Sequence, residues 1–333
     1  MHPDRDAPDF TRDHVNLASP LMGSEAVLAS DEFFADKARV LQDGPAVFKP
    51  GVFDDNGKWM DGWETRRRRD GGHDWLLIRL GVPGVVSGVD VDTSHFTGNY
   101  PPAATLEGVL SDGVPGPDAL WRPLVPVTPL GPDAHHYVAV SDPGTVNWLR
   151  LSIFPDGGVA RLRVYGAPAR VWSDAERAGV VELSAARNGG RVVAWNDAHY
   201  GEIQRLLAEG RGETMGDGWE TRRRREPGND WLIVALSAPG VIERVEVDTA
   251  HFKGNFPDRC SLQGALIEQA TGASLVTQSM FWPELMGEKK LRADAIHDFS
   301  GDGLAAAGPV SHVRLNIFPD GGVSRLRIFG RLA

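Results

Sequence analysis

The segment Asp61-Gly-Trp-Glu-Thr-Arg-Arg-Arg-Arg69 returns unchanged later in the chain, as Asp217-Gly-Trp-Glu-Thr-Arg-Arg-Arg-Arg225. The similarity extends beyond this segment, because 26 of the 41 residues in 61–101 are identical to those in 217–257. The most polar part of the block is also its most repeated part. The chain therefore contains two copies of one domain, and its function was built from that unit.

A second pair of segments extends the repeat toward the C-terminal end of each copy. Residues 149–166 share 13 of 18 positions with residues 313–330. The chain has 333 residues, about twice the roughly 150 residues of a typical domain. We therefore divide it into a polar N-terminal lead-in at 1–15, a first repeat at 16–168 and a second repeat at 169–333.

The composition is that of a globular protein with a buried core and no strongly basic surface. Hydrophobic residues make up 41% of the chain, charged residues make up 24%, and the formal net charge is −10. The acidic balance argues against a nucleic-acid partner, which needs a broad positive field. No apolar run reaches the roughly 18 residues of a membrane span, so no membrane partner is expected. A single cysteine, Cys260, excludes an intrachain disulfide and favours a reducing, cytoplasmic location.

Most of each repeat is predicted to be β-structure. Residues 75–80 and 231–236 are short apolar runs that end at a Pro-Gly pair. Residues 89–92 and 245–248 alternate apolar and acidic side chains, with the period of a half-buried strand. Pro155-Asp-Gly-Gly158 has the composition of a tight hairpin turn, and its Asp is more typical of a capped turn than of a catalytic group. Frequent turn signals and few helical segments predict an all-β fold with one antiparallel sandwich per repeat.

The arginine run breaks the pattern expected of a half-buried strand, which is polar on one face only. If Trp63–Arg69 is extended, guanidinium groups project from both of its faces. Conflicts of this kind tend to occur at functional sites or interfaces. The arginines either pair with nearby acids, or at least one binds a ligand carboxylate through the bidentate fork that lysine lacks. Two further arginines, Arg161 and Arg325, alternate with apolar neighbours and could also reach a ligand.

A second polar constellation is Asp92-x-x-His95-x-x-x-Asn99, repeated as Asp248-x-x-His251-x-x-x-Asn255. It follows an alternating strand and enters a glycine-containing loop, and functional side chains are often found on loops held by a rigid sheet. A histidine oriented by a carboxylate can transfer protons near neutral pH. Alternatively, Asp and His would be two ligands of a metal, or the segment would be a structural turn whose Asp and Asn bond local backbone.

The chain resembles the allantoicase family in four motifs that occur in order in both repeats: Asp-Gly-Trp-Glu-Thr-Arg-Arg-Arg, Asp-Trp, Val-Asp-Thr-x-His-Phe-x-Gly-Asn and Ile-Phe-Pro-Asp-Gly-Gly. The resemblance extends from about Asn16 to Gly330. It implies two tandem jelly-roll domains related to galactose-binding-like sandwiches, assembled as a homo-oligomer. It also implies hydrolysis of the small molecule allantoate to ureidoglycolate and urea, a step in the use of purine-derived nitrogen.

The chemistry of this substrate suggests roles for the repeated residues. Allantoate is a carboxylate whose α-carbon carries two ureido groups, so its cleavage needs a cation, hydrogen-bonding groups for the ureas and an acid/base pair. One well-placed acid or base contributes about 10²–10⁴-fold in rate. With the resemblance, catalytic roles are expected for His95, Glu64 and Asp92 and for His251, Glu220 and Asp248. Substrate-binding roles are expected for Arg67, Asn99 and Arg161 and for Arg223, Asn255 and Arg325.

Other classes of function remain alternatives. Galactose-binding-like sandwiches often bind ligands without catalysis, although such modules usually expose aromatic platforms and the repeated residues here are charged or amide side chains. A related lyase that releases ureidoglycolate is a third reading, and the product that accumulates distinguishes it. The sequence requires no cofactor, and a divalent metal stays an alternative for the Asp and His pairs.

Overall fold

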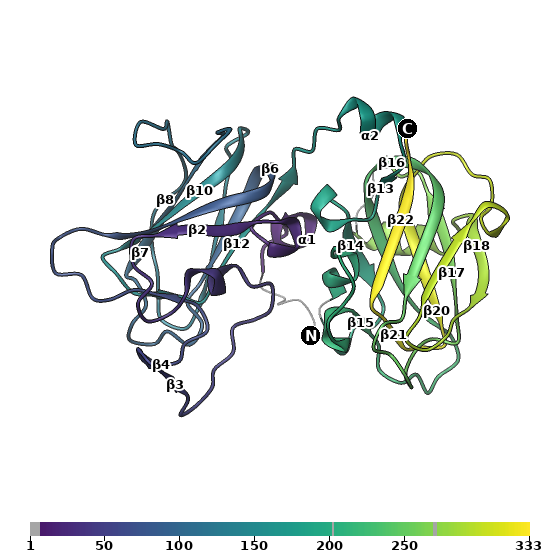
Figure 1. Cartoon of the computed structure of the whole chain (residues 1–333), viewed down its shortest axis with the longest axis horizontal. Helices are drawn as coiled ribbons and strands as arrows, with labels where there is room; N and C mark the ends of the chain where they lie inside the picture. Colours follow the sequence, from purple (N-terminus) through teal and green to yellow (C-terminus); the bar gives the residue numbers. More distant parts are fainter. Residues whose placement is uncertain (1–6, 202, 269–271) are drawn as a thin grey trace. The chain divides into compact units, whose positions relative to one another are not determined.

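The chain folds into two compact units that divide between Arg170 and Val171. The computed structural model describes residues 7–201, 203–268 and 272–333 (Figure 1). Almost all of the regular structure is β, and each unit contains one large set of paired strands folded into a sandwich. The prediction of an all-β chain with two tandem sandwiches is confirmed.

The first unit is organised around one long strand, β6 (Asp74–Asp92), which contributes to both layers of the sandwich. The other strands of this sheet system are β1 (Val15–Asn16), β2 (Glu25–Ala29), β7 (Ala103–Val109), β8 (Arg122–Pro129), β9 (His135–Ala139), β10 (Thr145–Phe154) and β12 (Arg161–Pro168). The first half of β6 pairs with β2 and most of β10, and its second half pairs with β9 and β12. All of these pairs are antiparallel, as the alternating strands predict.

The second unit repeats this arrangement around β16 (Asp230–Asp248). Its other strands are β13 (Val181–Glu182), β14 (Arg191–Trp195), β17 (Arg259–Ala265), β18 (Glu284–Lys290), β19 (Ile296–Ser300), β20 (Val310–Phe318) and β22 (Arg325–Leu332). The strand order β13-β22-β16-β20-β17-β18 corresponds, one for one, to β1-β12-β6-β10-β7-β8 of the first unit. The sequence repeat is therefore a repeat of the fold.

Short two-stranded ladders lie outside the large sheets and carry the polar motifs. In the first unit, β5 (Trp63–Glu64) pairs with β11 (Gly158–Val159). In the second unit, β15 (Trp219–Glu220) pairs with β21 (Gly322–Val323) in the same register. A further hairpin, β3 (Phe53–Asp54) with β4 (Gly57–Lys58), belongs to the first unit.

Helices are few and short. The α-helices are α1 (Phe10–Asp13), α2 (Asp174–Ala178) and α3 (Gly272–Ser279), and the 3₁₀ turns are η1 (Pro20–Met22), η2 (Lys37–Leu41), η3 (Ala186–Asn188), η4 (Ile203–Leu207), η5 (Met215–Asp217) and η6 (Gly301–Gly303). Residues 1–6 of the expected lead-in lie outside the described residues. The remainder of the lead-in contains α1 and the first residue of β1, and the Phe10 ring of α1 lies 5.7 Å from the ring of Tyr165 in β12.

The motif tryptophans anchor the polar segments to each core. Trp63 and Trp219 are fully buried, each among the aliphatic side chains of its own unit. Each indole N–H donates to a backbone carbonyl, that of Asp31 at 2.8 Å and that of Asp197 at 2.7 Å. A buried indole needs such an acceptor, so these bonds determine where the residues after each tryptophan emerge.

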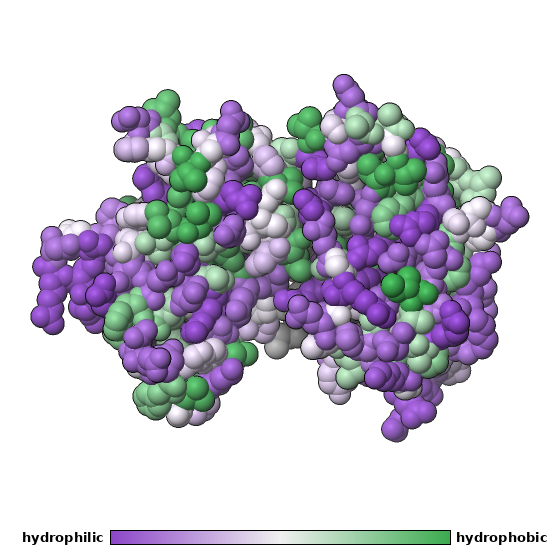
Figure 2. All heavy atoms as spheres, in the orientation of Figure 1, coloured by the Kyte–Doolittle hydropathy of each residue, from purple (hydrophilic) through white to green (hydrophobic). Residues whose placement is uncertain are grey.

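Polar and charged side chains cover most of the face of each unit that Figure 2 shows, with apolar residues in small separate groups. Among the described residues, none of the helices has the length and apolar character that crossing a bilayer demands.

Candidate functional site

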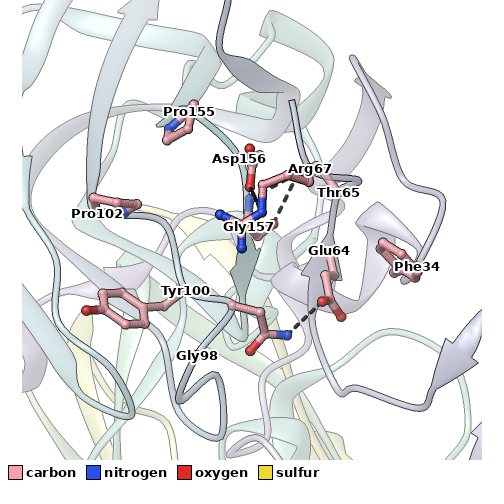
Figure 3. A pocket seen from close by; sticks show the side chains of 11 residues that line it. Phe34, Glu64, Thr65, Arg67, Gly98, Tyr100, Pro102, Pro155, Asp156 and Gly157 are labelled. Atoms are coloured by element: carbon pink, nitrogen blue, oxygen red, sulfur yellow. Dashed lines mark hydrogen bonds and ion pairs between the residues drawn. The ribbon is translucent and has the colours of Figure 1, made fainter. Parts of the chain in front are cut away.

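A cavity of about 300 Å³ opens in the first unit, where the segment after β5, the loop at 98–102 and the turn at 155–157 converge. Its walls are formed by Phe34, Glu64, Thr65, Arg67, Gly98, Asn99, Tyr100, Pro102, Pro155, Asp156 and Gly157 (Figure 3). Three residues predicted from the sequence, Glu64, Arg67 and Asn99, thus line the same cavity. They come from two motifs, and Glu64 and Asn99 are 35 residues apart in the sequence.

The arginine run divides between the two roles that the sequence left open. Arg66 pairs with Asp31, and its Nε and Nη2 both donate to the one oxygen Oδ1, at 2.9 and 2.7 Å. Arg68 pairs with Asp70 and Asp74, each at 2.8 Å. Arg67 lies between them with 72% of its side chain exposed, and it lines the cavity. The neighbouring arginines thus form close ion pairs, whereas Arg67, with its Nε 3.8 Å from the Asp156 carboxylate, lines the cavity.

The backbone after β5 is fixed by the turn that follows β10. Thr65 donates its N–H to the carbonyl of Gly157 at 3.1 Å, and its hydroxyl accepts the Gly157 N–H at the same distance. The Asp156 carboxylate accepts the backbone N–H of Arg68 at 2.7 Å. Its other oxygen lies 3.8 Å from Nε of Arg67. Two residues of the turn therefore hold the segment on both sides of Arg67.

The loop that carries Asn99 is attached to the same turn. Gly158 donates its N–H to the carbonyl of Asn99 at 2.7 Å. Gly157 has φ of 141°, and a Cβ there would lie 2.7 Å from the backbone nitrogen of Pro101. Only glycine allows this approach, which explains why the repeated turn has glycine at this position.

Glu64 is the buried acid of the cavity. Its Oε1 accepts a hydrogen bond from the side-chain amide of Asn99 at 2.7 Å (Figure 3). Burial raises the pKa of the Glu64 carboxyl, and this effect outweighs the lowering effects of Asn99 and of the Lys58 charge; Asp54 adds to the increase. Glu64 therefore keeps its proton to a higher pH than an exposed glutamate, as a general acid requires.

Asp92 and His95 lie outside the walls of the cavity and shape a turn at the end of β6. The Asp92 carboxylate accepts the N–H of Ser94 at 2.8 Å. His95 has φ of 69°, donates its backbone N–H to Asp133 at 2.7 Å, and has ring Nε2 at 3.1 Å from the carbonyl of Ala46. The constellation therefore separates: Asn99 reaches the cavity, whereas the Asp and His hold backbone, as the structural alternative expects.

Arg161 also lies outside the cavity walls, because its guanidinium is buried in the loop that precedes β5. It pairs with the Asp61 carboxylate at 2.7 Å. It donates to the carbonyls of Ala160, Gly44 and Asp61 at 2.7, 2.9 and 3.0 Å. These partners use all of its nitrogens in holding the loop, so Arg161 is not directed at the cavity.

The second unit reproduces several of these contacts with its own residues. Glu220 accepts a hydrogen bond from Asn255, and Asp320 accepts the N–H of Arg224 at 2.8 Å. Arg223, the counterpart of Arg67, is exposed, and Glu220 is half-buried where Glu64 is buried.

The remaining predicted site residues of the second unit also form hydrogen bonds with backbone groups. His251 has φ of 70° and its ring Nε2 lies 2.7 Å from the carbonyl of Gly212. The Asp248 carboxylate accepts the N–H of Ala250 at 2.8 Å and pairs with Arg211 at 3.1 Å. Arg325 is buried and donates to three backbone carbonyls, those of Gly210, Asp217 and Ser324.

Eight of the eleven cavity residues were not proposed as site residues from the sequence: Phe34, Thr65, Gly98, Tyr100, Pro102, Pro155, Asp156 and Gly157. Asp156 is part of a repeated motif, but turn residues are repeated for structural reasons as well. In the structure the Asp156 carboxylate makes two contacts. It accepts the backbone N–H of Arg68, which holds the turn, and it approaches the guanidinium of Arg67. Within the described ranges, no three His, Cys, Asp or Glu side chains converge as a metal site would require.

Comparison with known proteins gives one consistent result. A family model for the allantoicase repeat matches residues 15–169 and 181–333. The chain is 62% identical to probable allantoicase 2 of Burkholderia pseudomallei (strain K96243), over 99% of this chain and 98% of the relative. It is 56% identical to a probable allantoicase of Ralstonia nicotianae (strain ATCC BAA-1114 / GMI1000), again over 99% and 98%. The crystal structure of allantoicase from Saccharomyces cerevisiae matches with a TM-score of 0.80 and 32% identity, covering 96% of this chain and 93% of that one.

Proposed function

The chain belongs to the allantoicase family, and from this premise we propose that the cavity of its first repeat hydrolyses allantoate to ureidoglycolate and urea. The enzyme is a hydrolase, and its substrate is a small anion. We place the site here because buried Glu64 and exposed Arg67 line one cavity of about 300 Å³. An acid whose pKa is raised by burial and a cation are the two groups this reaction needs most.

Arg67 binds the substrate carboxylate in this proposal. Its guanidinium supplies a fork of N–H donors that matches a carboxylate, and its Nε lies 3.8 Å from the Asp156 carboxylate. Hydrogen bonds to charged groups contribute about 1.5–3 kcal/mol each. Asn99, fixed by its bond to Glu64, presents its remaining amide atoms to a ureido group.

Glu64 moves the protons. It gives its proton to the leaving ureido nitrogen while the bond from that nitrogen to the α-carbon breaks. The lone pair of the second ureido nitrogen forms a double bond to the same carbon, and the resulting cation lies beside the new Glu64 carboxylate. Water then adds to the α-carbon and Glu64 takes up one of its protons. Urea and ureidoglycolate are released, and the carboxyl regains its starting state.

These roles keep Glu64 and Arg67 from the residues expected from the sequence and leave out three others in each repeat. His95, Asp92 and Arg161, and likewise His251, Asp248 and Arg325, have hydrogen-bond partners in the backbone. We therefore assign proton transfer to Glu64 and carboxylate binding to Arg67. In this proposal the chain's own residues carry every step, so treatment with a chelator should leave turnover unchanged. Loss of turnover that added divalent metal restores would contradict it.

The products test the reaction. Incubation of the purified protein with allantoate should release one urea and one ureidoglycolate for each allantoate consumed. Allantoate that persists across the pH range would overturn the enzymatic proposal and favour a binding module. Accumulation of products from ureidoglycolate itself would favour the related lyase.

We also propose a cytoplasmic enzyme that assembles as a homo-oligomer. The single cysteine, Cys260, is buried and leaves no intrachain disulfide, which is typical of proteins in a reducing compartment. Light scattering should give a mass that is a multiple of the 36.1 kDa of one chain. A monomer at working concentration would contradict the expected assembly.

A further inference from the structure

Asp156 is a buried carboxylate in the wall of the cavity. It belongs to the turn at 155–157, only 6% of the residue is exposed, and its side chain lies next to Arg67 (Figure 3). A carboxylate removed from water in this way needs hydrogen-bond donors for its oxygens. The donors that the chain supplies to Asp156 therefore show whether its place in the turn accounts for the whole group.

The two oxygens of Asp156 have different surroundings. Oδ2 accepts the backbone N–H of Arg68 at 2.7 Å, which holds the turn against the segment after β5. Oδ1 lies 3.8 Å from Nε of Arg67, which is longer than a hydrogen bond. Within the described ranges no donor reaches Oδ1, and the atom is not fully enclosed by protein. One oxygen thus has a structural partner, and the other is a free acceptor at the cavity wall.

The second repeat separates the structural contact of this aspartate from its contact in the cavity. The counterpart, Asp320, accepts the N–H of Arg224 at 2.8 Å, so the bond that holds the turn is present in both repeats. Asp320 is half-buried, and among the residues that the structure describes it forms no ion pair with Arg223. The approach of a buried carboxylate to the cavity arginine is therefore a property of the first repeat.

The cavity has a cation for the substrate carboxylate, and it also needs acceptors for the ureido groups. Arg67 has N–H donors only, and Glu64 donates as long as it keeps its proton. Asn99 gives one N–H to Glu64 and keeps its carbonyl oxygen as a neutral acceptor. Each ureido group of the substrate carries N–H donors on both of its nitrogens. Oδ1 of Asp156 is the charged acceptor that the cavity wall offers to them.

The charge of Asp156 also acts against other ligands. Arg67 attracts any small carboxylate, with or without N–H groups. A carboxylate bound to Arg67 lies near the negative Oδ1, and an N–H donated by the ligand to that oxygen offsets the repulsion. A ligand without N–H groups meets the repulsion and leaves the acceptor without a partner.

We propose that Asp156 is the specificity-determining residue of the first-repeat cavity: its Oδ1 accepts the N–H groups of a ureido group while Arg67 binds the carboxylate of the same molecule. The inference rests on the proposed function and states what that site selects, which is a carboxylate with a ureido group on its α-carbon. Carboxylates of the same size that lack N–H groups are rejected. Proton transfer stays with Glu64.

Asp156→Asn tests the acceptor without removing the bond that holds the turn. The asparagine carbonyl can still accept the N–H of Arg68, whereas its amide nitrogen replaces the acceptor at the cavity. KM for allantoate should rise about 10–100-fold, since one charge-assisted hydrogen bond is lost. Asp320→Asn is the matched control, because it makes the same change in the turn of the second repeat, and it should leave KM near the parent value.

Two ligands of the same shape give a readout that a structural role would not produce. N-carbamoylglycine has a carboxylate and one ureido group, and levulinate has carbon in place of both nitrogens. Calorimetric titration of the parent protein should show tighter binding of N-carbamoylglycine. In Asp156→Asn this ligand should bind about tenfold more weakly, whereas levulinate should bind more tightly because the repulsion is gone. A variant that merely distorts the cavity would weaken both.

The outcomes separate this inference from the proposed function. Opposite changes for the two ligands in Asp156→Asn, with Asp320→Asn like the parent, would support it. A parent enzyme that releases urea would overturn this inference alone if it binds the two ligands equally, or if Asp156→Asn weakens both or leaves KM unchanged. A parent protein that releases no urea, yet shows the opposite changes, would overturn the proposed function alone. A parent protein that neither releases urea nor prefers N-carbamoylglycine would overturn both.

Discussion

The two repeats place the same polar residues on the same scaffold, and they differ in what surrounds them. Glu64 bonded to Asn99 corresponds to Glu220 bonded to Asn255. In the first repeat the glutamate is buried, and the segment between η2 and Asp61 carries the hairpin 53–58; in the second it is half-buried, and the segment between η4 and Asp217 is shorter. The two repeats thus share the hydrogen bonds between the motif residues and differ in the segments that surround them.

Substitutions in the walls reinforce this contrast. Tyr100 of the first cavity corresponds to Phe256, which lacks the hydroxyl. Pro102 corresponds to Asp258, which pairs with Arg259 at 3.1 Å. Arg67 approaches Asp156, whereas the described part of the chain shows no ion pair between the counterparts Arg223 and Asp320. The same sequence motif therefore creates two different electrostatic environments.

The largest expected difference between the repeats concerns the two glutamates. Glu64→Gln should reduce kcat for urea release by about 10²–10⁴-fold, because the amide cannot supply the proton. Glu220→Gln should leave kcat within about twofold of the parent value by comparison. Steady-state urea assays with both folded variants measure this directly. The reverse ranking would assign catalysis to the second repeat.

A smaller effect is expected at the arginines. Arg67→Ala should raise KM for allantoate by about 10–100-fold, since hydrogen bonds to a charged group are lost. Arg67→Lys should recover only part of this, because lysine lacks the planar fork. Arg223→Ala is the matched variant in the other repeat. Equal increases in KM for the two alanine variants would mean that both repeats bind substrate.

The smallest effect is expected at the histidines, and it concerns stability. His95→Asn keeps a residue that tolerates positive φ but loses the ring contact to Ala46, so unfolding should become easier by about 1 kcal/mol. The same holds for His251→Asn. Urea release should persist in the double variant while chemical denaturation shows the loss. A folded double variant without turnover would indicate that a histidine transfers the proton.

The fold was predictable from sequence because its signals are local and occur twice. The alternation in 89–92 and the turn composition of 155–158 appear in β6 and in the turn after β10. Repetition itself separates two domains, since each copy must build its own core around its own tryptophan. Strand order depends on pairing between distant segments, and no local pattern in the sequence specifies it.

The site was predictable only in part, for a physical reason. A residue can be identical in the two repeats because the fold requires it or because the chemistry requires it. Repetition alone does not distinguish these two cases. Arg161 and Glu64 are equally repeated, yet one is enclosed by backbone carbonyls and the other lines a cavity. The positive φ of His95 and the burial of Glu64 arise from tertiary contacts that spacing does not reveal.

Binding stoichiometry tests the inequality of the two repeats most directly. Calorimetric titration of the inactive Glu64→Gln protein with allantoate separates binding from turnover. We expect one allantoate per chain, with binding lost when Arg67→Ala is added and retained when Arg223→Ala is added. Binding that survives Arg67→Ala and disappears with Arg223→Ala would contradict the assignment of the site to the first repeat.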